Sequence, residues 1–238
     1  MRKIPTPKRP RTAKRPVART AVREDGTQTR RQLIEVAGRL FAEQGYLRAT
    51  SKEICEIADT NIAAVNYHFG GKDGLYAAVL EEAHARLVSI ELVTTATRGD
   101  ADLSDTLRML FTRALGQIAQ HDPDAWALRV LSREILAPTP LADRMIANQV
   151  LPKMKLVGGT IARALGVPAN HPAVSRCIVN IVGPCAFLLI TNPDWHKKVF
   201  PSLGLDAESL VEHMVTFALG GLQATAANLK RTKGRHGA

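Results

Sequence analysis

The stretch 50–75 constrains the fold of this chain most, because short segments with helical apolar spacing alternate there with polar breaks. Thr50 is placed to cap a first helix, and Glu53 three positions later completes the pattern of a capping box. A polar run then interrupts the apolar spacing, and its last residue, Asn61, is a suitable cap for a second helix over 62–69. Two short helices joined by a tight turn predict a helix-turn-helix.

In a helix-turn-helix, the second helix lies in the DNA major groove, where its outward side chains meet the base edges. The base-reading set would consist of Asn61, Ile62, Ala63, Ala64 and Asn66. Because this set is apolar apart from the asparagines, we expect contacts to thymine methyl groups and an asparagine bonded to adenine. Thr50 and Ser51, at the start of the preceding helix, are placed to donate hydrogen bonds to phosphates across the groove.

The run NIAAVNYHFGGKDGLYAAV resembles the signature of TetR-type transcriptional regulators, where a helix ending in an aromatic–His–aromatic run is followed by a small residue, a Lys and an apolar helix. Upstream, ATSKEICEIA and TRRQLIEVAGRLFAEQGY are similar to that family's second and first helices, so the resemblance covers about residues 29–92. It implies that Tyr67, His68 and Lys72 hold DNA phosphates. A phenol, an imidazole and an ammonium near a helix amino terminus suit that role. The alternative for Tyr67 and His68 is packing at the helix end.

Three residues depart from that family's pattern. Asp59 occupies a turn position where glycine is usual, so a positive φ there would strain the turn, although Asp tolerates this region better than most residues. Cys55 stands where alanine is usual and is small enough to keep the packing. Asn66 stands where tyrosine is usual, so it either reads a base or is packed inside.

Apolar residues recur at helical spacing through the rest of the chain, and no segment is typical of a strand. We therefore expect an all-α fold. Its parts would be a disordered basic leader (1–26), a three-helix domain with the helix-turn-helix (27–75), a helical ligand-binding and dimerisation domain (76–229) and a basic tail (230–238). The expected helices outside the helix-turn-helix span 29–44, 72–95, 103–121, 122–136, 139–165 and 170–191, with a last helix capped by Asp206 after a loop.

The positive charge of the chain is concentrated at its ends. The net charge is +10, but residues 1–23 hold nine Lys or Arg and no acid, and four more basic residues follow Leu229. Because these thirteen positive charges exceed the net charge of +10, the remaining residues together carry a slightly negative charge. A leader rich in cations and prolines cannot bury enough surface to fold alone. It is a solvated tail, an arm that follows DNA phosphates or enters the minor groove, or both, because a tail that is disordered alone can become ordered on DNA.

Motifs for catalysis or metal binding do not stand out. The seven His and three Cys show no metal-ligand spacing, and there is no G-x-S-x-G motif or phosphate-binding loop. We therefore expect no enzyme, no metal and no cofactor. Cysteines in apolar surroundings favour a reducing compartment. No segment reaches 18 uninterrupted apolar residues, and the amino terminus lacks the apolar part of a signal peptide. These features predict a cytoplasmic protein without membrane contact.

The partners expected are double-stranded DNA with a palindromic operator, a second copy of the chain and a small effector. The last two long helices are apolar almost all round, which favours a homodimer. The resemblance implies that they form a four-helix bundle with the partner's pair, and that the protein is a repressor released by an inducer. The alternative is an architectural DNA-binding protein that tolerates any sequence and binds through its basic tails.

The effector site is predicted from two prolines inside helices. Pro152 and Pro184 each free the carbonyl four residues earlier, that of Asn148 and of Asn180. Such kinks are either packing features or bends that face a ligand cavity. Apolar bulk with a few amides is typical of small-molecule sites, so the ligand should be largely apolar. The expected lining is Met109, Trp126, Met145, Asn148, Gln149, Asn180 and Phe187.

Overall fold

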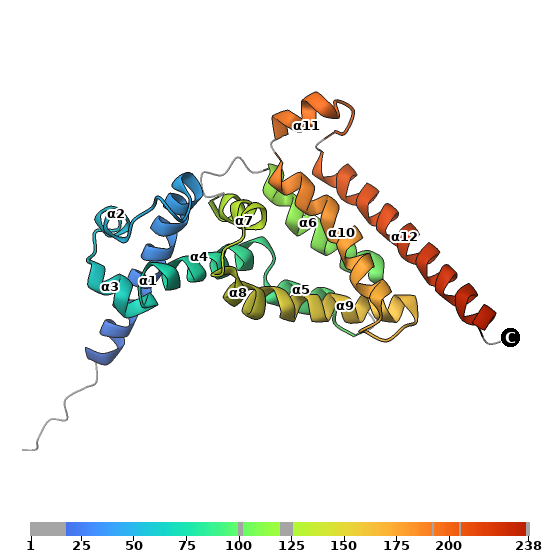
Figure 1. The fold of residues 1–238 in the computed structure, drawn as a ribbon, viewed down its shortest axis with the longest axis horizontal. Coiled ribbons are helices and arrows are strands. Elements are labelled where there is room, and N and C mark those ends of the chain that lie inside the picture. Colours follow the sequence, from blue (N-terminus) through green and yellow to red (C-terminus); the bar gives the residue numbers. More distant parts are fainter. Residues whose placement is uncertain (1–17, 100–101, 120–125, 192, 205, 237–238) are drawn as a thin grey trace, which may run out of the picture.

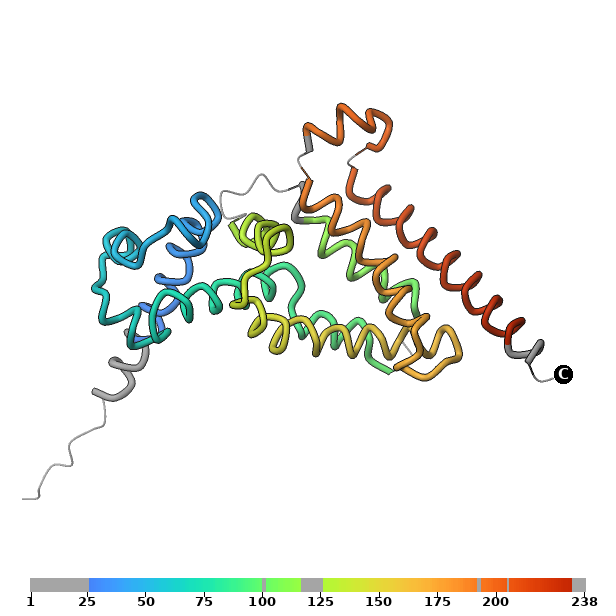
Figure 2. Tube along the Cα trace, viewed as in Figure 1, coloured from blue at the N-terminus to red at the C-terminus, as the bar shows by residue number. Residues whose placement is uncertain are grey.

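The computed structural model describes residues 18–99, 102–119, 126–191, 193–204 and 206–236. Every regular element among them is a helix, which confirms the all-α prediction. The molecule is elongated, with α1–α3 at one end and α12 at the other (Figure 1, Figure 2). The helices are α1 (Ala18–Gln44), α2 (Ser51–Ile57), α3 (Ile62–Phe69), α4 (Lys72–Leu87), α5 (Ile90–Ala96), α6 (Leu103–Ala119), α7 (Trp126–Leu136), α8 (Ala142–Met145), the π-helix η1 (Ile146–Val150), α9 (Leu151–Leu165), α10 (Pro172–Ile190), α11 (Pro193–Val199) and α12 (Ala207–His236).

The helix-turn-helix forms where the sequence predicts it, as α2 and α3. The Thr50 hydroxyl oxygen accepts from the Glu53 amide at 3.2 Å. The Glu53 carboxylate does not return that bond in a capping box. It accepts instead from the side-chain amide of Gln44 at 2.9 Å, so it ties α2 to the end of α1.

The first helix is longer than predicted. α1 begins at Ala18, upstream of the expected start at Thr29. Residues 18–26 of the predicted disordered leader are therefore helical, while residues 1–17 lie outside the described part of the chain.

The predicted continuous helix over 72–95 is wrong. α4 ends at Leu87 because Val88 takes an extended conformation. Ser89 then caps the separate helix α5, and its hydroxyl oxygen accepts from the Leu92 amide at 3.2 Å. The connection between the two ends of the molecule therefore contains a break.

The segment 139–165 also differs from the single helix expected. Thr139 does not cap it with its side chain, because its amide and its hydroxyl both donate to the Glu134 carboxylate, at 2.6 and 2.9 Å. The helix starts as α8 and widens into η1 just before Pro152, so the proline falls at the beginning of α9. A π-turn of this kind frequently marks a functional site. The expected cap at Asp122 lies outside the described residues.

The chain after α10 holds one helix that the sequence did not predict. The expected loop over 192–205 contains α11, which projects from the body of the molecule (Figure 1). Asp206 caps α12 as predicted, and its carboxylate accepts from the Ser209 amide at 2.9 Å. α12 then continues to His236, beyond the expected start of a basic tail at 230.

Two hydrophobic clusters form the core. The first joins α1–α4 with α7 and α8, and the second joins α5, α6, α9, α10 and α12. α4 contributes Leu75, Val79 and Leu80 to the first cluster, all fully buried. Because α7 packs in the same cluster through Trp126 and Val130, the helix-turn-helix end and part of the second expected domain share one core.

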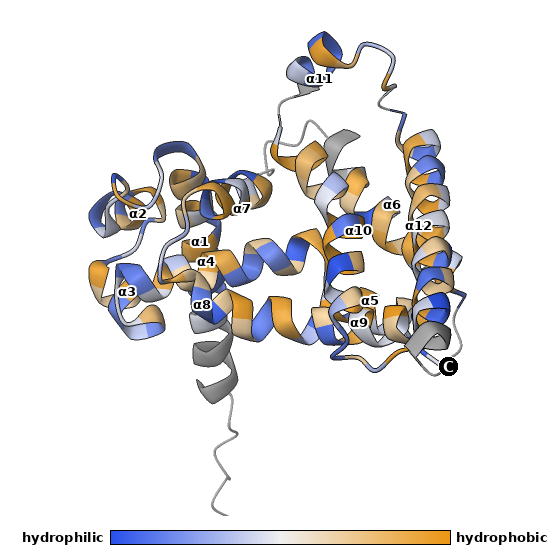
Figure 3. Cartoon of the chain, turned by 45° about the vertical axis from the view of Figure 1, so that its right-hand side comes forward, coloured by the Kyte–Doolittle hydropathy of each residue, from blue (hydrophilic) through white to orange (hydrophobic). Residues whose placement is uncertain are grey.

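Among the described residues, α10 is the one helix long and apolar enough to cross a membrane, by length and composition alone. In this fold it packs against α6, α9 and α12. The side chains that it buries in the second cluster are Ala173, Val174, Cys177, Ile181, Cys185 and Leu188. Figure 3 shows hydrophobic and hydrophilic residues along both α10 and α12.

Candidate functional site

α3 presents a largely exposed outer face at the end of the molecule. Val65 is fully buried, so it anchors the inner side of the helix. Ile62 and Tyr67 are 54% and 85% exposed, and Ala63 and Asn66 are exposed as well. Asn66 is exposed, so it is not packed inside, and base reading by Asn66 stays a prediction. Of the predicted base-reading set, Ala64 is half-buried against the core.

Asn61 has a structural function in addition to any contact with a base. Its side-chain oxygen accepts from the Ala64 amide at 3.0 Å and caps α3. The side-chain NH₂ group keeps its two donors. Asn61 can therefore offer donors to a base edge, while its acceptor is already engaged.

The turn between α2 and α3 takes the strained conformation expected of a glycine position. Asp59 has φ 46°, in the left-handed region that Asp enters more readily than most other residues. The Thr60 amide donates to the Cys55 carbonyl at 3.0 Å and closes the turn. Cys55 is buried as expected, and burial raises the pKa of its thiol.

The three predicted phosphate-binding residues lie around the junction of α3 and α4. The Tyr67 and His68 rings pack edge to face with centroids 4.9 Å apart. The Lys72 ammonium lies 4.5 Å from the centre of the Tyr46 ring. The Tyr46 hydroxyl donates to Asp73 at 2.5 Å, and this bond, with burial, raises the pKa of Tyr46 to about 12. Tyr46 thus positions both residues at the first turn of α4.

A close backbone contact fixes where α4 starts. A β-carbon on Gly74 would meet the Phe69 carbonyl oxygen at 1.8 Å, so only glycine fits. Gly71 precedes α4 without a side-chain cap. The amides of the first turn lack helical partners, so they can bind an anion such as a phosphate beside Lys72.

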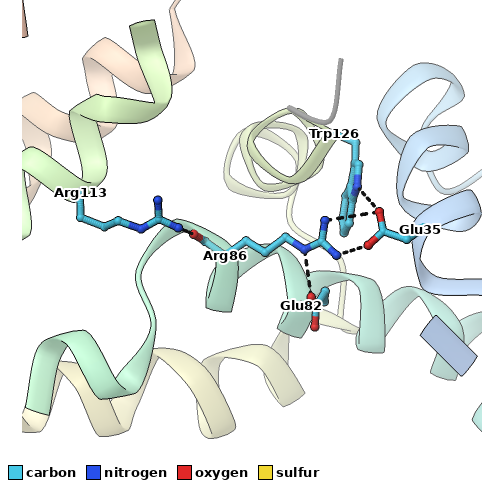
Figure 4. Close-up of polar contacts among 5 residues, drawn as sticks. All are labelled: Glu35, Glu82, Arg86, Arg113 and Trp126. Atoms are coloured by element: carbon cyan, nitrogen blue, oxygen red, sulfur yellow. Dashed lines mark hydrogen bonds and ion pairs between the residues drawn. The ribbon is translucent and has the colours of Figure 1, made fainter. Parts of the chain in front are cut away.

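A polar network behind this end ties α1 to α4 and α7 (Figure 4). The Arg86 guanidinium forms ion pairs with Glu35 and with Glu82, the latter at 2.9 Å. The Trp126 indole donates to Glu35 at 3.1 Å, and the Arg86 guanidinium lies 4.9 Å from the ring centre. Arg113 of α6 donates to the Arg86 carbonyl. The network therefore connects four helices of both clusters.

Trp126 needs a glycine opposite it. A β-carbon on Gly38 of α1 would come within 2.5 Å of the indole ring. Trp126 has no exposed surface, so the ring could not move aside without disturbing the core. α7 is thus held close against α1.

The seven predicted effector-site residues do not line one cavity. Trp126 and Met145 are buried in the first cluster. Asn148 and Gln149 lie in η1, where Asn148 donates to Glu81 of α4 at 2.7 Å. The others lie elsewhere: Met109 is partly exposed on α6, and Phe187 packs on Trp195 with ring centroids 5.7 Å apart. The expectation failed because it placed residues by helical spacing before the helix packing was known.

Asn180 is the one member of that set that lines a described hollow. This hollow has a volume of about 230 Å³ and lies between α6, α10 and α12. Its walls are mostly apolar: Phe111, Asn180, Ile181, Pro184, His213, Met214, Phe217 and Ala218. Pro184 lines this hollow and Pro152 does not, and the prediction that both bends face a ligand cavity stays untested.

A buried polar cluster joins α4 to η1 and α9. Lys153 is 1% exposed, and its ammonium donates to His84 Nδ1 at 2.9 Å and to Gln149 Oε1 at 3.1 Å. Burial lowers the pKa of Lys153 to about 8, against the opposing effect of Glu91. Burial, and then the neighbouring Lys153, lowers the pKa of His84 to about 4. The imidazole is therefore neutral at neutral pH.

Sequence reasoning missed both Lys153 and His84, although a signal was present. His84 lies four residues after Leu80, on the apolar side of α4. Lys153 lies four residues before Val157 and three before Leu156, both of which pack in the second cluster. A polar side chain within an apolar stripe indicates a buried group. In the described residues, no group of three or more His, Cys, Asp or Glu is placed to hold a metal.

Two protein-family models match the chain. The model for "Bacterial regulatory proteins, tetR family" matches residues 33–79, which hold α2, α3 and parts of α1 and α4. The model for "HTH-type transcriptional dual regulator CecR, C-terminal domain" matches residues 103–222.

Curated relatives are similar over much of the chain. The transcriptional activator FasR of Mycolicibacterium smegmatis is 30% identical over 193 residues, which cover 81% of this chain and 82% of FasR. The dual regulator CecR of Shigella flexneri is 30% identical over 154 residues, 61% of this chain and 68% of CecR. The repressor Rv1474c of Mycobacterium tuberculosis is 32% identical over 123 residues, 49% of this chain and 64% of its own.

Solved structures share the fold. The fatty acid degradation regulator FadR from Bacillus halodurans has a TM-score of 0.60 at 19% identity, over 80% of this chain and 97% of that one. A TetR-like transcriptional regulator from Rhodococcus sp. RHA1 has a TM-score of 0.57 at 17% identity, over 82% and 96%.

Proposed function

The chain belongs to the TetR family of bacterial transcriptional regulators, and from that premise we propose that it is a repressor released from its operator by a small-molecule effector. Members of this family are DNA-binding regulators and not enzymes. The relatives include an activator, a dual regulator and a repressor. Repression is therefore the part of the proposal that an in vitro transcription assay with operator DNA must test.

The exposed face of α3 carries the proposal of specific DNA binding. Its outward residues are small or apolar around Asn61 and Asn66, so the helix can approach the floor of the major groove closely. Tyr67 is 85% exposed near the end of α3, and Lys72 is the first residue of α4, where the amide groups are free. In this arrangement Tyr67, His68 and Lys72 hold one strand of the backbone. Thr50 and Ser51 hold the other.

A homodimer, typical of the family, would present two α3 helices to successive major grooves. Support comes from exposed apolar side chains on α10 and α12. Val179 and Val182 are 67% and 44% exposed, and Phe217 is 73% exposed. A second copy that covers these side chains would remove them from water.

We place the effector in the helical domain and its response in the contacts of α4. α4 begins at the DNA-facing end, and its last residues approach the break before α5. A largely apolar small molecule that shifts α4 would change the distance between the two α3 helices of a dimer. The same proposal places the protein in the cytoplasm, with no membrane partner.

The deciding experiment is a footprint on the promoter of the protein's own gene, repeated at several salt concentrations. A specific repressor should protect a palindrome whose half-sites lie about one helical turn apart or a multiple of it. An architectural protein would instead bind every sequence alike and lose that binding as salt rises. Uniform protection without a palindrome would contradict the proposal.

Asn61→Asp tests whether Asn61 contacts a base, because this substitution keeps the cap of α3. Aspartate still accepts the Ala64 amide bond, so the melting temperature should change little. It loses the NH₂ donors and brings a negative charge to the groove, so operator affinity should fall about 100-fold or more. Fluorescence anisotropy with operator DNA measures this fall. Lys72→Gln is the comparison, because it should weaken all sequences alike and lower the salt slope by about one.

Phe217→Glu tests the dimer. A charge on this exposed position should leave the fold intact but convert the protein largely to monomer, because it would be buried without a partner. Sedimentation velocity measures the change. Thr216→Glu, at the neighbouring exposed position, is the matched control. A dimer that persists in Phe217→Glu would place the interface elsewhere.

A further inference from the structure

α11 projects beyond the end of α10 and leaves its outer side without cover (Figure 1). Among the described residues, no other helix packs along it. Its inner side is nevertheless fixed, because His196 is 1% exposed. The His196 Nε2 atom pairs with the Thr191 hydroxyl, and that hydroxyl also donates to the Phe187 carbonyl. The last turn of α10 therefore holds α11 in one position.

The outer side of α11 is apolar. The Trp195 ring packs edge to face on Phe187, with centroids 5.7 Å apart, and on Phe200, with centroids 5.9 Å apart. Val199 lies four residues after Trp195, on the same side of α11. These four side chains, here called the α11 patch, are each between 42% and 47% exposed. A contiguous exposed patch of large apolar side chains marks an interaction site, whereas single exposed side chains do not.

The α11 patch continues the exposed apolar face of α10. Val179, Gly183 and Phe187 recur at i, i+4 and i+8, and all three are exposed, so they form one stripe that leads to α11. The sequence of α10 holds no charged residue after Arg176, and none occurs in 199–205. The buried centres of protein interfaces are depleted in charge and enriched in aromatic residues. The stripe and the α11 patch together have this composition.

We propose that the α11 patch is buried against the second copy of the chain in the homodimer. The interface then extends beyond α10 and α12 to α11, the helix that lies between them in the sequence. The inference rests on the homodimer of the proposed function, and it goes beyond that function by assigning a contact to α11.

A second copy fits the α11 patch better than an unrelated protein, because the patch is continuous with the face that this copy covers. A subunit seated on Val179 and Val182 lies next to the outer side of α11 and can bury the patch without a further partner. In a two-fold contact both subunits use the same surface, so one apolar face meets another. Each dimer then buries two α11 patches, and one substitution acts on both.

The two tryptophans of the chain make the α11 patch observable in the intact protein. Trp126 has no exposed surface, so only Trp195 should respond to a change at the patch. The wild type is diluted through its transition from dimer to monomer, which sedimentation velocity locates, and acrylamide quenching of the emission is measured at each concentration. As the dimer forms, the emission of Trp195 should move to shorter wavelength and lose most of its quenching. Equal quenching of Trp195 in monomer and dimer would overturn the proposal.

Trp195→Phe supplies the emission of Trp126 alone, which is subtracted at each concentration. In a separated subunit the Trp195 ring stays half-exposed, so its loss should cost the subunit itself little stability.

Val199→Glu tests the same contact by its energy. It places a charge where the dimer would bury it without a partner, so the dimer dissociation constant should rise about 10- to 100-fold. Lys197→Gln is the matched control, because it changes the charge by the same amount. Lys197 is exposed on the opposite side of α11, two residues from both Trp195 and Val199, so its dissociation constant should stay that of the wild type. Circular dichroism checks that both variants fold, and the quenching experiment requires neither.

The outcomes separate the contact of α11 from the proposed homodimer. If Val199→Glu dimerises as tightly as the wild type while Phe217→Glu is monomeric, the contact of α11 is overturned and the interface of α10 and α12 stands. The reverse result would support α11 and contradict the proposed face of α10 and α12. A wild type that sediments as a monomer at every concentration would contradict both.

Discussion

Replacing Trp126 by alanine should lower the free energy of unfolding by about 3–5 kcal/mol, the usual cost of truncating a fully buried aromatic side chain. Trp126 has no exposed surface, and it closes the contact between α1 and α7. Its loss also leaves Glu35 without the indole donor and Arg86 without the ring beneath it. For a chain of this length, the melting temperature should fall by about 6–20 °C, measured by circular dichroism.

The second tryptophan of the chain is the matched control. Trp195 on α11 is 44% exposed, so Trp195→Ala should cost about 1 kcal/mol or less. Gly38→Ala should destabilise the native protein, since its β-carbon meets the indole, but much less in the Trp126→Ala background. If Trp126→Ala cost no more than Trp195→Ala, the first cluster would not depend on this ring.

The DNA-facing end could be predicted because its signals are local. Thr50 and Asn61 cap the helices that follow them, and the turn residue Asp59 takes the positive φ expected of a glycine position. Each of these features depends on residues three or four positions apart in the sequence. The start of α1 was missed because Thr29 fits a cap pattern, although the helix continues through it.

The effector domain could not be predicted in the same way, because its features depend on contacts distant in sequence. The break at Val88 and the π-turn before Pro152 are local events. Which side chains they bring together depends on how α4 packs against α9. The sequence placed Trp126 in the lining of an effector site, and nothing local in it indicates that the ring contacts α1 at Gly38. The seven predicted lining residues were therefore distributed over separate parts of the fold.

The charge on Lys153 makes a second large effect measurable without any ligand. Burial lowers the pKa of Lys153 to about 8 in the folded protein, whereas an unfolded lysine titrates near 10.5. Below pH 8 both states carry the proton, and the cost of the buried ammonium is present in full. Between about pH 8 and 10.5 the unfolded state binds more protons than the folded state, so stability rises with pH through this window.

The free energy of unfolding of the wild type should therefore rise by about 2–3 kcal/mol relative to Lys153→Met between about pH 8 and 10.5. Methionine fills the same space without a charge, so the difference between the two proteins isolates this one group. Urea denaturation at a series of pH values measures it, and Lys155→Met should stay parallel to the wild type. His84 gives a separate window, because its pKa of about 4 means that stability is lost as pH falls from 6.5. A constant difference between wild type and Lys153→Met across the alkaline window would show that folding does not lower the pKa of Lys153.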